Sequence, residues 1–252
     1  DAIRVSRFAG DDPIYAYILS AYSQVKNLDK SKIADVYTKI SQNKTPADKK
    51  AFYQKLKADI EALPKFGNDI KEVDLFARDV AYTYTKPLEN YKNPRGGIFQ
   101  AGLYPVSANV PLGAQTGATP DGRLAGTPVA DGVSPAAGRD VNGPTAACNS
   151  VSKLDHYIAS NGTLFNMKFH PSALKGLGGL ESFVALVRGY FDQKGSHMQF
   201  NVVSRETLLD AQQNPEKYKS LVVRVAGYSA LFTTLSRSLQ DDIINRTEQG
   251  GF

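Results

Sequence analysis

Cysteine is nearly absent from this chain of 252 residues, which contains only Cys148 and has no tryptophan. A single cysteine excludes an internal disulfide and suits a reducing compartment. No run approaches the ~18 apolar residues of a membrane-spanning helix, and residues 1–4 lack the layout of a signal peptide. We therefore expect a cytoplasmic protein with no membrane association.

Several other classes of site also lack their usual signals. The three histidines, His156, His170 and His197, are not spaced like metal ligands, so we expect no metal. The glycine cluster at 176–179 lacks a dinucleotide-binding fingerprint and is expected to form a turn before a helix. The adjacent acids at 241–242 are expected to face solvent or to cap a helix.

The charge pattern argues against nucleic-acid binding. The formal net charge is +5, but Lys and Arg are interleaved with Asp and Glu, as in residues 48–50 and 55–59. Such mixing is typical of solvated helix faces, whereas nucleic-acid binding favours a basic stripe with stacking aromatic residues. With 42% hydrophobic and 22% charged residues, the chain has an ordinary globular composition.

Hydrophobic periodicity divides the chain into three regions. Residues 13–91 show helical spacing, and Val73, Phe76, Val80 and Tyr84 are expected on the buried face of a helix over 69–91. Residues 93–149 contain glycine or proline every few positions and are expected to be mostly loops that line a cavity.

The last hundred residues are expected to alternate strand and helix. Strands are predicted over 163–169 and 197–202, each with one polar face, and a buried strand over 221–225. Helices are predicted over 180–191 and 204–213, and Ser238 followed by Asp241 resembles a capping box before a last helix.

Gly227 interrupts an apolar run in the segment Arg224-Val-Ala-Gly-Tyr-Ser-Ala230. In isolation, a glycine in such a run indicates a bulge or a close approach of the backbone. Glycine is also the residue that can best hold an unpaired electron on its α-carbon, because no side chain prevents the electron from spreading over both flanking peptide groups. This segment resembles the radical-bearing loop of the glycyl radical enzymes, the family that includes pyruvate formate-lyase.

Further blocks in the same order carry the resemblance, which covers about residues 63–252. They are residues 91–97, 101–108, 117–123, 130–135, 143–146, 150–153, 197–203 and 240–247. The resemblance implies an α/β fold: a helical segment without a family match (1–62), the C-terminal part of a pyruvate formate-lyase-like α/β barrel (63–158) and a glycine radical domain (159–252). It also implies a homodimer in the full enzyme and an anaerobic bacterial setting, in the cytoplasm or in a microcompartment.

The resemblance assigns roles to the loop residues. Gly227 would store the radical, installed by an activating enzyme of the radical S-adenosylmethionine class, with no diffusible cofactor. Val225 and Tyr228 would pack the loop against oxygen, and a direct electron-relay role is the alternative for Tyr228. Arg224 would anchor the loop to a carbonyl or carboxylate, and a surface ion pair is its alternative. Cys148 matches no catalytic position and is expected to be a small buried hydrophobic residue.

The family also uses a cysteine loop, commonly Cys-Val-Glu, and no Cys-x-Glu occurs in this sequence. The chain thus resembles a C-terminal portion that stores the radical without the cysteine that uses it. Residues 143–166 look most like B12-independent glycerol and propane-1,2-diol dehydratases, and by that resemblance Tyr104 and Val106 face a small diol.

The alternatives are a lyase of the isethionate or choline type, a non-catalytic radical-donor subunit that docks on a partner enzyme, and a small α/β binding module in which the glycine is structural. Gln100 stands where a sulfonate-cleaving enzyme would be expected to place an arginine. A neutral diol therefore fits better.

Overall fold

The computed structural model describes residues 61–119 and 123–252, together with positions 45, 47, 51, 54 and 58. The helices expected between residues 13 and 62 lie outside the described residues, apart from those single positions. The chain divides into two compact units: the first comprises residues 1–63 and 113–127, and the second comprises residues 64–112 and 128–252. Gly227, Tyr104 and Val106 all belong to the second unit.

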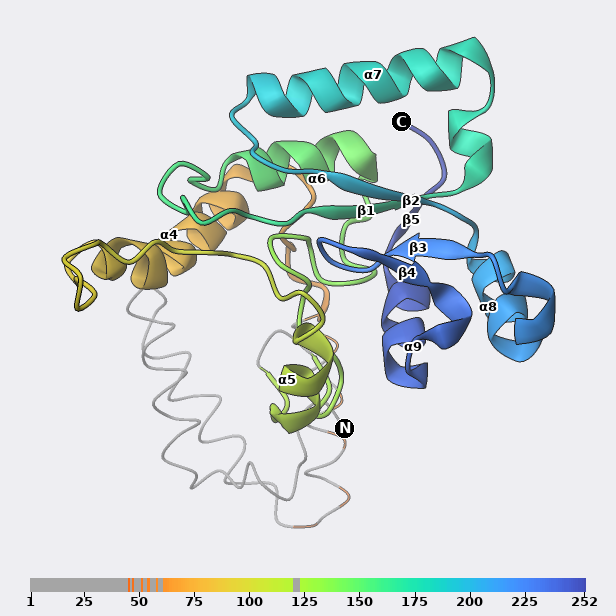
Figure 1. Ribbon diagram of the computed structural model, residues 1–252, viewed down its shortest axis with the longest axis horizontal. Helices are drawn as coiled ribbons and strands as arrows, with labels where there is room; N and C mark the ends of the chain where they lie inside the picture. Colours follow the sequence, from red (N-terminus) through yellow and green to blue (C-terminus); the bar gives the residue numbers. More distant parts are fainter. Residues whose placement is uncertain are drawn as a thin grey trace. The chain divides into compact units, whose positions relative to one another are not determined.

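Three parallel strands lie at the centre of the second unit (Figure 1). Their order is β2–β1–β5, with β1 at Asn166–Phe169, β2 at Gln199–Val202 and β5 at Glu248–Gln249. Parallel neighbours need a crossover connection, and between β1 and β2 the 3₁₀ helix η1 (Pro171–Leu174) and α7 (Gly176–Asp192) provide it. Both strands predicted from alternation are confirmed, and each is shorter than expected.

One face of this sheet is apolar and packs against two helices. Met167 and Phe169 of β1 and Phe200 of β2 share a core with α6 (Gly143–Ser152) and α7. Phe183 of α7 lies edge-on to Phe200, with their ring centroids 4.7 Å apart. Apolar burial on this face anchors the sheet to the helices.

The other face is polar but also buried. Asn166 and Lys168 of β1 lie opposite Gln199 and Asn201 of β2, and none of the four is more than 9% exposed. Buried polar side chains need hydrogen-bond partners. On this face, the C-terminal part of the chain supplies them.

That C-terminal part is a hairpin with two helices. It comprises β3 (Val222–Arg224) paired antiparallel with β4 (Ser229–Leu231), α8 (Arg205–Gln213) and α9 (Arg237–Asn245). Two 3₁₀ turns, η2 (Pro215–Tyr218) and η3 (Phe232–Thr234), connect them. A second core that includes Val223, Phe232 and Ile243 holds these elements together.

The ends of these two helices agree with the sequence to different degrees. The Ser204 side chain caps α8 by accepting the Thr207 N–H, as the predicted helix start requires. The capping box predicted at Ser238 and Asp241 is wrong, because α9 begins at Arg237 and both residues lie inside it. Its N-cap residue, Ser236, makes no side-chain capping bond.

Helix α4 (Lys71–Leu88) confirms the helix predicted over 69–91, but its packing face differs from the predicted one. Val80 and Tyr84 are 53% and 50% exposed, whereas Asp74 is fully buried. The Lys153 ammonium, just after α6, lies 2.8 Å from the Asp74 carboxylate. An ion pair with a neighbouring helix therefore determines which side of α4 faces inward.

Two helices interrupt the segment 93–149, which we expected to be mostly loop. They are α5 (Asn109–Gln115) and α6, and α6 buries Ala147 and Val151 completely. The small residues of α6 give no clear helical period, and Pro144 fits the first turn of a helix. The periodicity therefore missed this helix.

The glycine cluster 176–179 was also misassigned, because it forms the first turn of α7. A Cβ atom on Gly179 would lie 2.7 Å from the Ala173 carbonyl oxygen. Glycine here allows η1 to approach the start of α7 closely.

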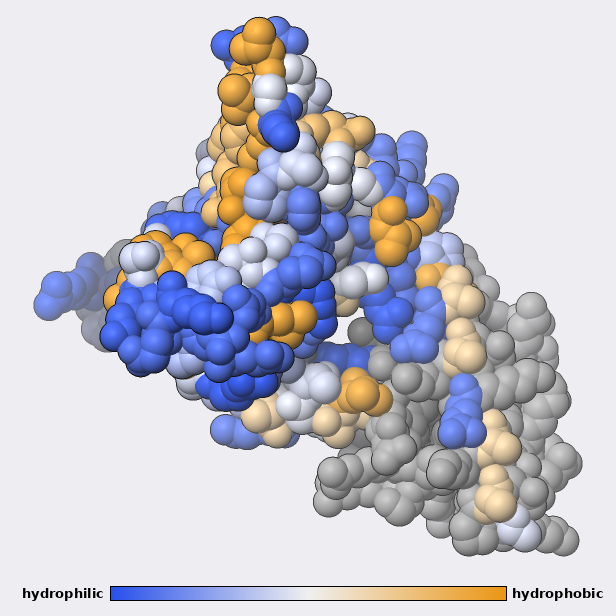
Figure 2. All heavy atoms as spheres, turned by 90° about the vertical axis from the view of Figure 1, so that its right-hand side faces the viewer, coloured by the Kyte–Doolittle hydropathy of each residue, from blue (hydrophilic) through white to orange (hydrophobic). Residues whose placement is uncertain are grey.

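The outer side of α7 is apolar and exposed in this chain. Leu177, Leu180 and Val184 are 79%, 52% and 46% exposed. In Figure 2, apolar side chains gather on the arm at the top of the molecule, where α7 lies, while the part that faces the viewer is largely hydrophilic. Among the described residues, no helix combines the length and apolar character needed to cross a membrane.

Candidate functional site

Gly227 lies in the turn between β3 and β4, where the Val225 N–H donates to the Tyr228 carbonyl at 2.9 Å. Its φ angle of +84° belongs to the left-handed region, which glycine adopts without strain. A Cβ atom added there would meet only the Leu164 Cδ1 atom, at an ordinary 3.5 Å. Backbone conformation rather than crowding therefore favours glycine, and the residue belongs to a hairpin turn rather than a strand interior.

The hairpin is attached to the parallel sheet by side-chain amides of β2. The Gln199 Oε1 atom accepts the Gly227 N–H at 3.2 Å and an Arg224 guanidinium N–H at 2.8 Å. The Asn201 amide donates to the Arg224 carbonyl and accepts its N–H, both at 2.8 Å. Gln199 and Asn201 lie two residues apart and therefore project from the same face of β2.

A buried polar network continues from this contact into the core. The Gln199 Nε2 donates to the Asn166 Oδ1, and the Asn166 Nδ2 donates to the Asp131 carboxylate and, at 3.2 Å, to the Val225 carbonyl. Arg246 donates to the same Val225 carbonyl at 2.8 Å. Buried side chains thus hold the two successive peptide groups before the Gly227 α-carbon, through the Val225 carbonyl and the Gly227 N–H.

Charges of opposite sign meet at the inner end of this network. The Arg246 guanidinium lies 2.9 Å from Asp242 and 3.4 Å from Asp131. Burial raises the pKa of Asp131, and the positive charge of Arg246 opposes that rise. The expectation that Asp242 faces solvent or caps a helix is wrong, because its side chain is only 11% exposed and pairs with Arg246.

The residues predicted to support the loop occupy different environments. Val225 is fully buried, whereas Tyr228 is 36% exposed. Arg224 also reaches the Ser229 hydroxyl at 3.1 Å, so its side chain joins Gln199 to the start of β4. The Arg224 side chain thus anchors the hairpin to the Gln199 amide oxygen.

Tyr104 and Val106, the predicted substrate contacts, lie in a segment connected to the β3–β4 hairpin through Leu164. The Leu103 carbonyl accepts the Leu164 N–H at 3.1 Å, and Leu164 is the side chain nearest to the Cβ position of Gly227. Tyr104 and Val106 are 44% and 50% exposed. Val106 has a φ of +59°, a strained conformation for a β-branched residue.

Cys148 has the properties of a structural cysteine. It lies on α6, is 2% exposed, and its Sγ is 3.9 Å from the Met167 sulfur. Burial raises the pKa of its thiol to about 12, which keeps it protonated and unreactive at neutral pH. This environment agrees with the predicted role as a buried hydrophobic residue.

Two of the histidines have structural hydrogen bonds. The His156 ring contacts the Thr163 hydroxyl at 2.8 Å and the Val151 carbonyl at 2.9 Å, and the His197 Nδ1 accepts the Phe165 N–H at 3.3 Å. Burial lowers the pKa of both imidazoles.

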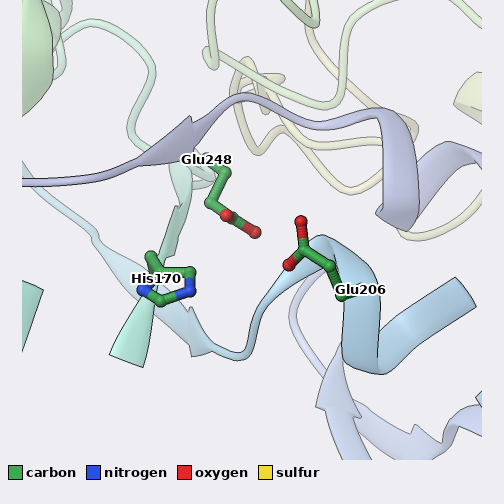
Figure 3. Close-up of side chains that lie close together, drawn as sticks. All are labelled: His170, Glu206 and Glu248. Carbon is green, nitrogen blue, oxygen red and sulfur yellow. The ribbon is translucent and has the colours of Figure 1, made fainter. Parts of the chain in front are cut away.

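The third histidine, His170, belongs to a cluster with Glu206 and Glu248 (Figure 3). Their potential ligand atoms lie within 4.8 Å of one another, an arrangement that spacings of 36 and 42 residues do not reveal. Glu248 already accepts the Arg205 N–H at 2.6 Å and lies 4.0 Å from the Lys168 ammonium. His170 comes directly after the last residue of β1, whereas Asn166 is its first residue. Four residues of strand rise place the two positions about 13 Å apart.

The comparisons with known proteins place these features in a family. A "Glycine radical" model matches residues 129–233, and a "Pyruvate formate lyase-like" model matches residues 27–113. The second match includes residues 27–62, for which the sequence resemblance found no counterpart. The division of the chain at 62/63 and 158/159 stays a prediction.

Solved structures and curated relatives agree with these matches. A structure of 1,2-propanediol dehydration in Roseburia inulinivorans has a TM-score of 0.81 and 69% identity, over 86% of this chain and 28% of that one. The glycerol-bound B12-independent glycerol dehydratase from Clostridium butyricum has a TM-score of 0.80 and 57% identity, over 88% and 28%. A probable dehydratase, YbiW, from Escherichia coli K12 is 50% identical over 75% of this chain and 24% of its own. The chain spans about a quarter of the length of the curated relatives it matches.

Proposed function

Because this chain belongs to the glycyl radical enzymes, we propose that Gly227 stores the radical of a dehydratase that converts a small diol, glycerol or propane-1,2-diol, into an aldehyde. The observation that carries the proposal is the placement of Gly227. It lies in the region matched as a glycine radical domain, at a hairpin turn with a left-handed backbone and free space beside its α-carbon. The likeness to the two diol-related structures supports the substrate class.

The same placement suits activation by another protein. An activating enzyme of the radical S-adenosylmethionine class would remove one hydrogen atom from the Gly227 α-carbon. The glycine is exposed in this chain, and its hairpin forms a two-stranded sheet separate from the parallel sheet. If the hairpin moved away from the parallel sheet to meet the activating enzyme, it would break side-chain hydrogen bonds to β2 but no strand pairing. This arrangement suits a hairpin that undocks and docks again.

Tyr104 and Val106 are the proposed substrate contacts. Backbone strain concentrates at functional sites, and the positive φ of Val106 is such a feature. The Tyr104 hydroxyl accepts the Asn161 Nδ2 at 2.9 Å, which orients the phenol and leaves its own proton available to a hydroxyl of the substrate.

The reaction also needs groups that this sequence does not contain. A cysteine thiyl would abstract hydrogen from C1 of the diol, and a carboxylate base would remove the C1 hydroxyl proton. The ketyl would then expel the neighbouring hydroxyl as water with the help of a general acid, and the product radical would take its hydrogen back from the thiol. Diol becomes aldehyde plus water. With no Cys-x-Glu in the sequence, these groups belong to the remainder of an α/β-barrel enzyme, a homodimer in our proposal.

Anaerobic activation followed by electron paramagnetic resonance tests the radical assignment. We expect a doublet from the remaining α-hydrogen of Gly227. Brief exposure to air should then cleave the backbone at Gly227 and release a peptide that begins near Tyr228. An activated sample that shows neither the doublet nor the cleavage would contradict the proposal.

The substrate class needs a separate test with the full-length protein. We expect consumption of glycerol or propane-1,2-diol to exceed that of isethionate and choline. Faster turnover of isethionate would favour the sulfite-lyase alternative, to which curated relatives 42% and 39% identical belong. Diol turnover by the present chain alone would contradict the requirement for a separate cysteine.

A further inference from the structure

We propose that Gln199 is a positioning residue of the radical site: its side-chain oxygen binds the Gly227 amide and holds the peptide group beside the radical-bearing carbon in one orientation. The inference rests on the proposed function of Gly227. It adds a residue outside the radical loop, on strand β2, 28 positions before the glycine.

The direction of the hydrogen bonds determines which end of the Gln199 amide faces the glycine. Its Nε2 donates to the Asn166 Oδ1, while the Asn166 Nδ2 donates to the Asp131 carboxylate and the Val225 carbonyl. Reversing the Gln199 amide would place two donors against each other at Gly227 and two acceptors against each other at Asn166. The buried Asp131 thus sets the orientation of the oxygen that reaches Gly227.

Gln199 can hold this orientation because it is 5% exposed and has partners at every polar atom. Its oxygen accepts from the Arg224 guanidinium at 2.8 Å as well as from the Gly227 N–H at 3.2 Å. A charged donor on the same oxygen strengthens its attachment. Asn201, the next residue on this face, hydrogen-bonds the Arg224 backbone and, within the described part of the chain, makes no hydrogen bond to Gly227.

The consequence concerns the radical itself. The unpaired electron spreads from the α-carbon over both neighbouring peptide groups, one of which includes the Gly227 N–H. A hydrogen bond to this N–H places the amide proton at a defined distance from an oxygen. The amide proton is therefore a spectroscopic reporter of the Gln199 contact.

The test compares three variants of the full-length protein after anaerobic activation: Gln199→Leu, Gln199→Glu and Asn201→Leu. The measurement is the coupling of the exchangeable Gly227 amide proton by electron–nuclear double resonance, with spin yield and thermal melting recorded in parallel. Gln199→Leu removes the acceptor and should change the coupling. Gln199→Glu retains an acceptor oxygen for the Gly227 N–H but loses the Nε2 donor to Asn166, so its coupling should lie closer to the wild-type value than that of Gln199→Leu. Asn201→Leu removes hydrogen bonds to the Arg224 backbone and none to Gly227, so it should keep the wild-type coupling.

Amide exchange before activation gives an independent measurement. Loss of one hydrogen bond should accelerate exchange of the Gly227 amide about fivefold in Gln199→Leu, but not in Gln199→Glu. A wild-type coupling in Gln199→Leu would overturn the inference, and so would an equal change of coupling in Gln199→Leu and Asn201→Leu. Absence of a doublet in the wild-type protein would instead refute the proposed function.

Discussion

Replacing Gly227 by alanine should abolish the radical at a small cost in stability. An L-residue in the left-handed region costs about 1–2 kcal/mol, and alanine recovers about 0.4–1 kcal/mol by restricting the unfolded chain. The new Cβ would meet only Leu164 Cδ1, at 3.5 Å, so no clash adds to the strain. We expect a net loss of about 1 kcal/mol, which lowers the melting temperature by about 2–4 °C.

Two other glycines calibrate this expectation. Gly138 has a φ of +76° with no atom within 4 Å of an added Cβ, so Gly138→Ala should cost the same strain and keep the radical. Gly132 has a φ of +68°, but its Cβ would collide with the Leu164 carbonyl oxygen. Gly132→Ala should therefore destabilise the protein by more than the other two.

The assay combines thermal melting by circular dichroism with paramagnetic resonance after activation. Gly227→Ala should melt within a few degrees of Gly138→Ala and show neither the doublet nor cleavage in air. A doublet in Gly227→Ala would refute the assignment of the radical. A melting temperature far below that of Gly138→Ala would refute the argument that the site has room for a Cβ.

Three further predictions concern the surrounding structure. Cys148→Ala should keep the radical, and the native Cys148 thiol should resist maleimide at pH 7 until the protein is unfolded, because burial raises its pKa to about 12. Burial raises the pKa of Asp140 to about 6, above the unfolded value of about 3.8. The free energy of unfolding of the wild-type protein should therefore fall by at most about 3 kcal/mol as the pH rises from 4 to 6. Urea titrations should show a smaller fall for Asp140→Asn. Lys153→Met should cost about 3 kcal/mol by leaving the buried Asp74 carboxylate unpaired, and adding Asp74→Leu should restore much of the loss in a double-mutant cycle.

The structure confirms the elements whose signals are local. Alternating side chains predicted β1 and β2, and the helix predicted over 204–213 agrees with α8. Helix α6 was missed because glycine, proline and small residues obscure its period. The inward face of α4 was assigned incorrectly because a charged residue, Asp74, is buried there by pairing with Lys153, which lies just after α6.

The amino-acid sequence alone singled out Gly227 as the candidate radical residue, because a glycine in this short segment stands among ordered blocks that resemble the family. The alternation of polar and apolar residues in the sequence also indicated that β1 and β2 each have a polar face. Only the tertiary structure showed that this face is buried against the hairpin and that Gln199 reaches Gly227 through it. The contact joins residues 28 positions apart, and its orientation depends on Asp131, a further 68 residues toward the N-terminus. Hydrogen bonds between such distant positions form only once the sheet and the hairpin have packed, so no local pattern encodes them.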